Sequence, residues 1–363
     1  MSTEQNNQSW QQNYKSELEK IAPILDNLNI VLDRSQVHVS GERYYTNNKK
    51  LVLIGEDVKN KKRVAIKMGL DLDSINEILV EKKCREVLKK INFASHVFLS
   101  PEEVFFVNKS DFVVFITAYV EQECTFLERP MQEQFFLALK TFEAQEGLHA
   151  TTYEHANVIS KIFGIWDAKN YLKTFDVYRN EIVSKLPGNN KLKTLLTETF
   201  GFLNKNSEII NLYSGFLVHW DFVPHNIRVV GRDVYFLDHS SMRFGNKHES
   251  WARFINFMTL YNPELERALI EYIKNNRSQE ETLSLQLMRI FRLTELIKYY
   301  VSTLGNLSGN ILTLNKKRID FWGNALEAVL HNQLMRKEII DEYKTTRDSL
   351  RSDDEKQRQK NLH

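Results

Sequence analysis

The stretch LVHWDFVPHNIRVV, residues 217–230, places three polar side chains between two apolar runs. His219, Asp221 and Asn226 lie in this break, and Pro224 precedes the asparagine by two positions. Two buried strands are usually joined by turn residues that suit particular backbone angles. A histidine, a carboxylate and an amide in this position therefore indicate a chemical role for the loop.

A second carboxylate, Asp238, follows a later predicted strand. The turn GRD separates the run IRVV from the run VYFL, and the latter is followed by Asp238. Such a hairpin brings Asp238 to the same edge as Asp221 and Asn226. Oxygen ligands of this kind suit Mg²⁺, which takes one or two carboxylates together with waters and phosphate oxygens. The remaining carboxylate can accept the proton of an attacking hydroxyl, so the loop contains the parts that phosphoryl transfer requires.

Phosphoryl transfer also needs a cation to hold the nucleotide phosphates. The predicted strand VAIK, residues 64–67, ends in Lys67, and a desolvated lysine needs an acidic partner. On the next predicted helix, SINEILVEKKCREVLKKI, Glu81 falls on the apolar stripe, whereas Glu77 is marginal. We therefore expect an ion pair between Lys67 and Glu81.

The rest of the chain divides into a strand-rich part and a helical part. Apolar alternation predicts strands in QVHVS, KKLVLIGED, RVAIKM, EEVFFVNK and DFVVFITAYV. The helix between the third and fourth of these strands is expected to have Ser74 as its N-cap. Helical spacing dominates beyond residue 130. We expect a polar tail and leading helix over 1–34, a nucleotide-binding lobe over 35–120, a hinge connector over 121–130, a helical lobe over 131–343 with a catalytic hairpin at 216–240, and a charged tail over 344–363.

Composition excludes several classes of protein. The 363 residues carry a formal net charge of +2 with interspersed signs, so no basic stripe predicts nucleic-acid binding. The two cysteines, Cys84 and Cys124, form no metal-ligand motif or disulfide framework. No targeting signal and no run of about 18 apolar residues is present. We expect a cytoplasmic protein without a membrane partner.

HWDFVPHN followed by YFLDHSS resembles the catalytic loop and metal-binding segment of the aminoglycoside phosphotransferase and choline kinase-like family, a branch of the protein-kinase-like fold. VAIK resembles the nucleotide-holding strand of that family, and FITAYVEQE resembles its connector between lobes. The resemblance extends over about residues 36–255 through a few short motifs. The chain departs from the family at Trp220 and His225, where small residues are common.

The resemblance implies an α+β fold with two lobes, of which the smaller is a five-stranded antiparallel sheet and the larger is mostly helical. It implies an enzyme that uses ATP and Mg²⁺ to phosphorylate a hydroxyl of a small molecule of the aminoglycoside, amino alcohol or sugar type. Asp221 would be the catalytic base, Asn226 and Asp238 would hold the metal, and His219 would brace the catalytic loop.

The nucleotide would be held by the strand-rich lobe. Lys67, steadied by Glu81, would bind the α and β phosphates. The remaining cofactor-binding positions implied by the resemblance are Ala65 as an apolar wall for adenine, Tyr119 and Glu121 as backbone partners, and Gly41 in a phosphate-covering loop.

Other interpretations remain open. Lys67 could be a solvated edge charge, and Glu81 could pair with Arg85 at i,i+4. An inactive kinase fold that serves as a scaffold is a second function. A protein kinase is a third, although only HSSMRFGNKHES separates Asp238 from the helix at Trp251, which leaves no long activation segment.

Overall fold

The computed structural model describes residues 14–36, 50–91, 96–148 and 156–352, with 12 and 356 as isolated positions; of residues 156–159 only the backbone is described. By its internal contacts the chain divides into two compact units. Unit 1 comprises Met1–Lys82 and Ser100–Glu121, and unit 2 comprises Lys83–Leu99 and Gln122–His363. Each unit is described by itself.

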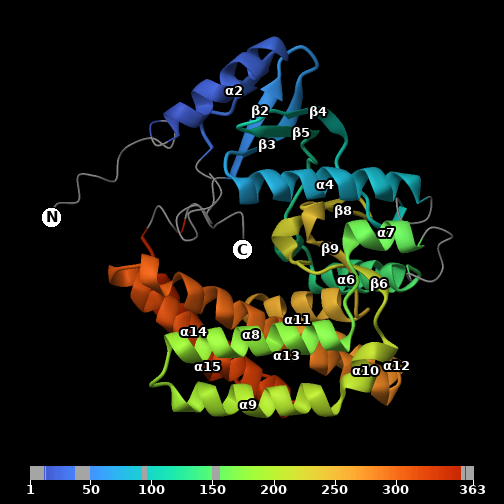
Figure 1. Cartoon of the computed structure of the whole chain (residues 1–363), viewed down its shortest axis with the longest axis vertical. Coiled ribbons are helices and arrows are strands. Elements are labelled where there is room, and N and C mark those ends of the chain that lie inside the picture. The colour runs from blue at the N-terminus through green and yellow to red at the C-terminus, as the bar shows by residue number, and fades with distance from the viewer. Residues whose placement is uncertain are drawn as a thin grey trace. The chain divides into compact units, whose positions relative to one another are not determined.

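Unit 1 is built on the small antiparallel sheet that the sequence predicted (Figure 1). Its spatial order is β1-β2-β3-β5-β4, and every neighbouring pair is antiparallel. The strands are β1 (Ile30–Leu32), β2 (Leu51–Asp57), β3 (Lys62–Gly69), β4 (Glu103–Asn108) and β5 (Val113–Ala118).

The first strand of this sheet differs from the one expected. The segment QVHVS was predicted to be a strand, but Val37 to Ser40 lie outside the described residues. The structure instead pairs Ile30–Leu32 with Gly55–Asp57, in a region predicted to be tail and leading helix. Asn29, with a φ of 55°, turns the chain out of the helix just before this strand. Three residues are too few to show an alternating pattern, which is why the sequence did not reveal β1.

Helices cover the two faces of the sheet. Helix α2 (Lys15–Asn27) buries Ile21 and Leu25 against the face that carries Val64, Ile66 and Met68. Helix α4 (Leu72–Lys90) packs Ile78 on the opposite face, in a cluster with two residues of β5, Val113 and Phe115. Because side chains alternate along a strand, residues 65 and 67 of β3 point to the same side as α4.

The start of α4 corrects one prediction. Ser74 is not the N-cap, because α4 begins two residues earlier, at Leu72. The carboxylate of Asp71 accepts the Ser74 N–H at 2.9 Å, and the Ser74 hydroxyl accepts the Leu70 N–H at 3.0 Å. Asp71, three residues before the serine, therefore caps the start of α4.

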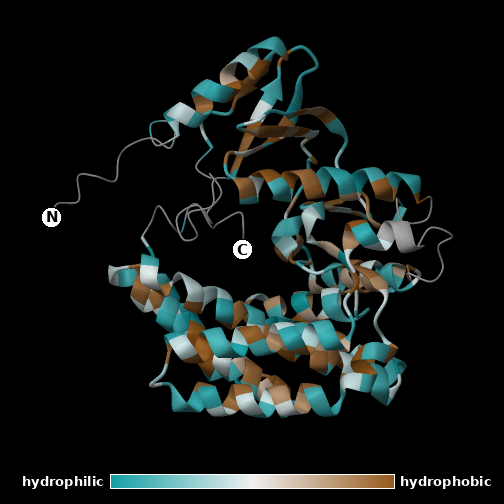
Figure 2. Cartoon of the chain, in the orientation of Figure 1, coloured by the Kyte–Doolittle hydropathy of each residue, from teal (hydrophilic) through white to brown (hydrophobic). Residues whose placement is uncertain are grey.

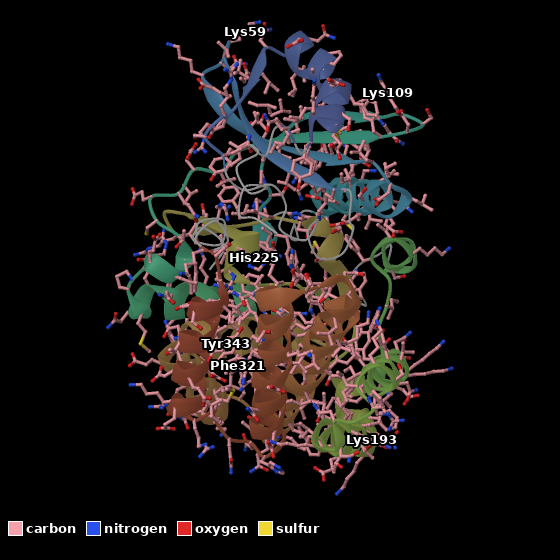
Figure 3. All side chains as sticks on the ribbon, turned by 90° about the vertical axis from the view of Figure 1, so that its left-hand side faces the viewer. Lys59, Lys109, Lys193, His225, Phe321 and Tyr343 are labelled. Atoms are coloured by element: carbon pink, nitrogen blue, oxygen red, sulfur yellow. The ribbon has the colours of Figure 1, made fainter. Side chains whose placement is uncertain are left out.

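Unit 2 is mostly helical, and its brown apolar stripes and teal polar faces are visible in Figure 2. Its long helix α13 contacts α8, α11 and α14. The helices are α6 (Met131–Glu146), α7 (Ala156–Phe163), α8 (Ala168–Lys185), α9 (Asn190–Lys205), α10 (Ser207–Leu212), α11 (Glu249–Tyr261), α12 (Pro263–Asn276), α13 (Gln279–Thr303), α14 (Gly309–Leu330) and α15 (Lys337–Leu350). Figure 3 shows Phe321 of α14 next to Tyr343 of α15, and their rings stack with centroids 4.3 Å apart.

One predicted helix is divided in two. The periodicity predicts a single helix over residues 191–213, but α9 ends at Lys205 and α10 begins at Ser207. Asn206 caps α9: its backbone N–H and its side-chain amide both donate to the Phe202 carbonyl. Asn is a common residue at such helix ends because its short amide can bond the local backbone.

Two small hairpins lie in unit 2. Strand β6 (Phe216–His219) pairs with β9 (Met242–Gly245), and β7 (Ile227–Val230) pairs with β8 (Asp233–Phe236). The sequence predicted β6, β7 and β8 but not β9. Gly231 permits the turn between β7 and β8 with a φ of 58°.

None of the helices in the described part of the chain has the length and apolar character needed to cross a lipid bilayer.

Candidate active site

Lys67 and Ala65 lie on one face of β3. Burial alternates along this strand, with Val64, Ile66 and Met68 fully buried and the two residues between them partly exposed. The facing residues of β2 are Ile54 opposite Ala65 and Val52 opposite Lys67. This face of unit 1 therefore combines an ammonium group with a partly exposed apolar surface.

The expected ion pair is present. The Lys67 ammonium lies 2.5 Å from a carboxylate oxygen of Glu81, and their side chains are 18% and 4% exposed. Glu81 lies on the buried stripe of α4 with Ile78 and Cys84. Glu77, one turn earlier on the helix, pairs with Lys50 instead. The helix phase predicted from the apolar stripe is thus confirmed, and the alternative of Lys67 as a solvated edge charge is wrong.

The connector begins where β5 ends. The Tyr119 N–H donates to the Arg63 carbonyl at 2.9 Å. The Arg63 guanidinium lies 4.2 Å above the centre of the Tyr119 ring and 3.3 Å from the Glu121 carboxylate. These contacts hold the backbone of residues 119–121 against β3. Gly41 lies outside the described residues.

In unit 2, His219 fixes the backbone on both sides of the hairpin formed by β7 and β8. Its side chain is fully buried, and Nε2 lies 2.9 Å from the Leu237 carbonyl oxygen and 3.1 Å from that of Asp238. The buried Ser250 hydroxyl donates to the His219 carbonyl at 3.0 Å. His219 therefore ties the end of β6 to the backbone after β8, which fits the bracing role expected for it.

An aromatic anchor holds the loop from below. The Phe222 ring stacks on Phe254 of α11 with centroids 5.3 Å apart, and it meets the ring of Phe142 edge-on. Phe222 is 1% exposed. The apolar side chain next to Asp221 thus fixes the loop to the core, and the carboxylate is left at the partly exposed side.

Two donors hold the Asp221 carboxylate. The Asn226 side-chain amide donates to Oδ2 at 2.9 Å, and Arg253 Nε of α11 donates to Oδ1 at 2.8 Å. Burial is the largest single influence and would raise the pKa of Asp221. The positive charges around the carboxylate, Arg253 foremost, together with the hydrogen bond from Arg253 outweigh burial and hold this pKa well below its usual range. Asp221 is therefore a fixed, ionised carboxylate at neutral pH.

The hairpin brings Asn226 next to Asp238. The Leu237 N–H donates to the Asn226 carbonyl at 2.8 Å, directly beyond the pair formed by Ile227 and Phe236. Asp238 has a φ of 57°, and one of its carboxylate oxygens accepts the Ser240 hydroxyl at 2.6 Å. Asp221, Asn226 and Asp238 thus lie together in unit 2, as the sequence predicted.

The side-chain oxygens of Asn226 and Asp238 can be compared with the ligands that Mg²⁺ prefers. With its amide nitrogen directed to Asp221, Asn226 keeps its side-chain oxygen for a ligand, and Asp238 adds a carboxylate. Among the described residues no group of three or more His, Cys, Asp and Glu side chains is arranged to hold a metal. A set of one amide and one carboxylate fits Mg²⁺ that is bound together with nucleotide phosphates, because this ion keeps waters and takes few protein ligands.

His225, labelled in Figure 3, is neutral at physiological pH. Burial lowers its pKa to about 4 against the attraction of Asp221. Its ring lies 6.0 Å from that of Phe257, centroid to centroid. The loop around Asp221 therefore receives no positive charge from this histidine.

Two residues of the site were not found from the sequence. Arg253 and Ser250 both come from α11, 32 and 31 positions away from their partners Asp221 and His219. They follow the helix start in HESWARF. Their side chains carry no motif, and only the path of α11 past the loop brings them to it.

Comparison with known proteins identifies solved structures that have a similar fold. No protein-family model and no curated protein matches the sequence. Among solved structures, a thermostable mutant of aminoglycoside phosphotransferase APH(4)-Ia, in ternary complex with ADP and hygromycin B, has a TM-score of 0.61 at 11% identity, covering 87% of this chain and 99% of that chain. A ternary complex of APH(2")-IIa with streptomycin and ATP has a TM-score of 0.54 at 12% identity, covering 85% and 97%.

A third neighbour acts on a different antibiotic class by its name. Macrolide 2'-phosphotransferase MphH from Brachybacterium faecium has a TM-score of 0.50 at 11% identity, covering 88% of this chain and 100% of that chain. At such identities the likeness concerns the fold alone. The chain therefore has the α+β, kinase-like fold of the aminoglycoside and macrolide phosphotransferases.

Proposed function

We propose that the protein is an ATP-dependent phosphotransferase that moves the γ-phosphate to a hydroxyl of a small molecule. The observation that supports this most is the group in unit 2, where Asp221, Asn226 and Asp238 lie together on one loop and hairpin. In unit 1, the buried Lys67–Glu81 pair provides a fixed ammonium group beside an apolar sheet face.

The reaction follows from these groups. The acceptor oxygen forms a bond to the γ-phosphorus, and the bond from that phosphorus to the β,γ-bridging oxygen breaks. ADP leaves with the bonding electron pair. The hydroxyl proton passes to the Asp221 carboxylate and then to solvent. Because its pKa is low, Asp221 is a weak base that orients the hydroxyl and takes the proton late, when the bond to phosphorus has formed.

The other residues bind and orient. Lys67 would hold the α and β phosphates, with Glu81 fixing its position. Adenine would lie on the face that contains Ala65 and would bond to the backbone at Tyr119 and Glu121. Asn226 and Asp238 would hold Mg²⁺, which supplies charge neutralisation for the phosphate oxygens when bound.

The segment after Asp238 argues against a protein kinase. A strand, β9, and helix α11 follow at once, and residues 241–250 are all buried. An activation segment must be exposed to receive a phosphate or a peptide. No described residue of this stretch has that exposure, and this favours a small-molecule acceptor.

Thermal unfolding with and without ligand tests this function against the scaffold alternative. MgATP at about 100 times its Kd should stabilise the protein by about 2.7 kcal/mol, and the shift should require Mg²⁺. Turnover of ATP should then appear with at least one member of a panel of amino alcohols, sugars and aminoglycosides. Binding without turnover across the panel would favour a scaffold, and no binding would refute the proposal.

A further inference from the structure

Arg253 is the charged group in contact with Asp221, and the scheme above gives it no part in binding. It lies one turn into α11 and reaches Asp221 with Nε only, at 2.8 Å. The second carboxylate oxygen of Asp221 is already bonded to Asn226. Arginine commonly binds a carboxylate with two nitrogens, and here the Asn226 amide takes the place of the second one.

The two terminal nitrogens of Arg253 are therefore left over. They donate to no described residue, and neither is among the buried polar atoms that lack a partner. The side chain is 16% exposed. The planar fork formed by these nitrogens is therefore not fully enclosed, and it lies beside the carboxylate of Asp221.

Two other arginines add positive charge near that place, Arg292 and Arg228, and both are engaged elsewhere. Arg228 donates to the backbone carbonyls of His225 and Ile227. His225 is neutral, and Val223 of the loop is buried and apolar. Arg292 is 3% exposed, with its guanidinium 5.1 Å from the centre of the Trp220 ring and an ion pair to Glu295. Of the described arginines around the loop, Arg253 is the one that contacts Asp221 directly and keeps an accessible fork.

We propose that the terminal nitrogens of Arg253 bind an oxyanion at the site of transfer, while its Nε positions Asp221. The inference rests on the function proposed above. A guanidinium fork matches the oxygens of a phosphoryl or carboxylate group and remains charged at any physiological pH. The oxyanion is either the phosphoryl group in transit or an acidic group of the acceptor, and the two sources share this chemistry.

The test compares Arg253→Gln and Arg253→Lys with Arg267→Gln, an exposed arginine of α12 away from the loop. Binding of MgADP, and of MgADP with aluminium fluoride as a mimic of the phosphoryl group in transit, is measured by calorimetry. If the fork contacts the phosphoryl group, Arg253→Gln should weaken binding of MgADP with aluminium fluoride about 100-fold, because the substitution removes the fork. MgADP alone should bind as in the wild type, and the lysine variant should lie between.

If the fork binds the acceptor instead, Arg253→Gln should have the wild-type affinity for MgADP both with and without aluminium fluoride. The KM for hydroxy acids or phosphorylated alcohols should then rise about 10-fold or more in Arg253→Gln, with no rise for uncharged alcohols. Either result supports the inference. It is overturned if Arg253→Gln matches Arg267→Gln in all these measurements, or if MgADP affinity falls as much as that of the fluoride complex, which indicates a structural role alone.

Thermal unfolding of each variant shows whether it is folded. If Arg253→Gln does not fold, the same measurements on Arg253→Lys decide whether the fork binds an oxyanion. Failure of the wild type to bind MgADP or MgATP would instead refute the function on which the inference rests. The two failures are therefore distinguishable.

Discussion

Replacement of Lys67 and Glu81, singly and together, tests whether the ion pair of unit 1 is a coupled unit. Their charged atoms are 2.5 Å apart, and Glu81 is almost fully buried. At an effective dielectric constant of about 20, two unit charges at this distance attract by about 6–7 kcal/mol. Removal of both charges from water offsets most of this attraction. We expect a coupling free energy of about 1–3 kcal/mol in the free energy of unfolding.

The assay is a double-mutant cycle with Lys67→Met and Glu81→Gln, measured by denaturant unfolding and by MgATP binding. Each single change should destabilise the protein and weaken MgATP binding. The double variant should lose less than the sum of the two. Glu86→Gln, at an exposed position of the same helix, is the control, and it should show a coupling with Lys67→Met below about 0.5 kcal/mol.

Additive effects of Lys67→Met and Glu81→Gln would refute the reasoning, because they would mean that the contact carries no net interaction. Normal MgATP binding by both single variants would mean that the ion pair stabilises the fold but does not contribute to nucleotide binding.

Two further predictions concern unit 2. Asp238→Ala should weaken MgATP binding in a magnesium titration, because it removes a charged oxygen ligand, and Asp233→Ala, an exposed aspartate of β8, should not; equal affinities for the two variants would place the metal elsewhere. Ser250→Ala should lower the free energy of unfolding by about 1–2 kcal/mol, because it leaves the buried His219 carbonyl without this donor; a loss below about 0.3 kcal/mol in denaturant unfolding would show that the bond is not needed.

The parts of the structure that depend on local periodicity could be predicted from the sequence. The alternation in RVAIKM identifies the face on which Lys67 lies, and the stripe Ile78, Cys84 and Leu88 sets the phase that brings Glu81 inward. The loop and hairpin from His219 to Asp238 were predictable because a two-stranded turn fixes which residues meet at its end.

The parts that depend on distant packing or on very short elements could not. Strand β1 has three residues, and β9 has four and pairs with β6 across more than twenty positions. The length of β1 is too short to show a period. Strand β9 is as long as β6, β7 and β8, but its sequence MRFG includes an arginine and a glycine and shows no apolar run. Arg253 was missed for a related reason, since an arginine on an amphipathic helix gives no sign of the partner that tertiary packing will bring to it.

Phosphoryl transfer with Asp221 as the proton acceptor is tested most directly by transfer of the labelled γ-phosphate from MgATP to a panel of small-molecule hydroxyl compounds, followed by chromatography and mass spectrometry. The wild type should give a phosphorylated product, and Asp221→Asn should lower its rate by about 1,000-fold or more with MgATP affinity unchanged. A near-normal rate in Asp221→Asn would contradict the claim, and so would the absence of any phosphorylated product from a wild-type protein that binds MgATP.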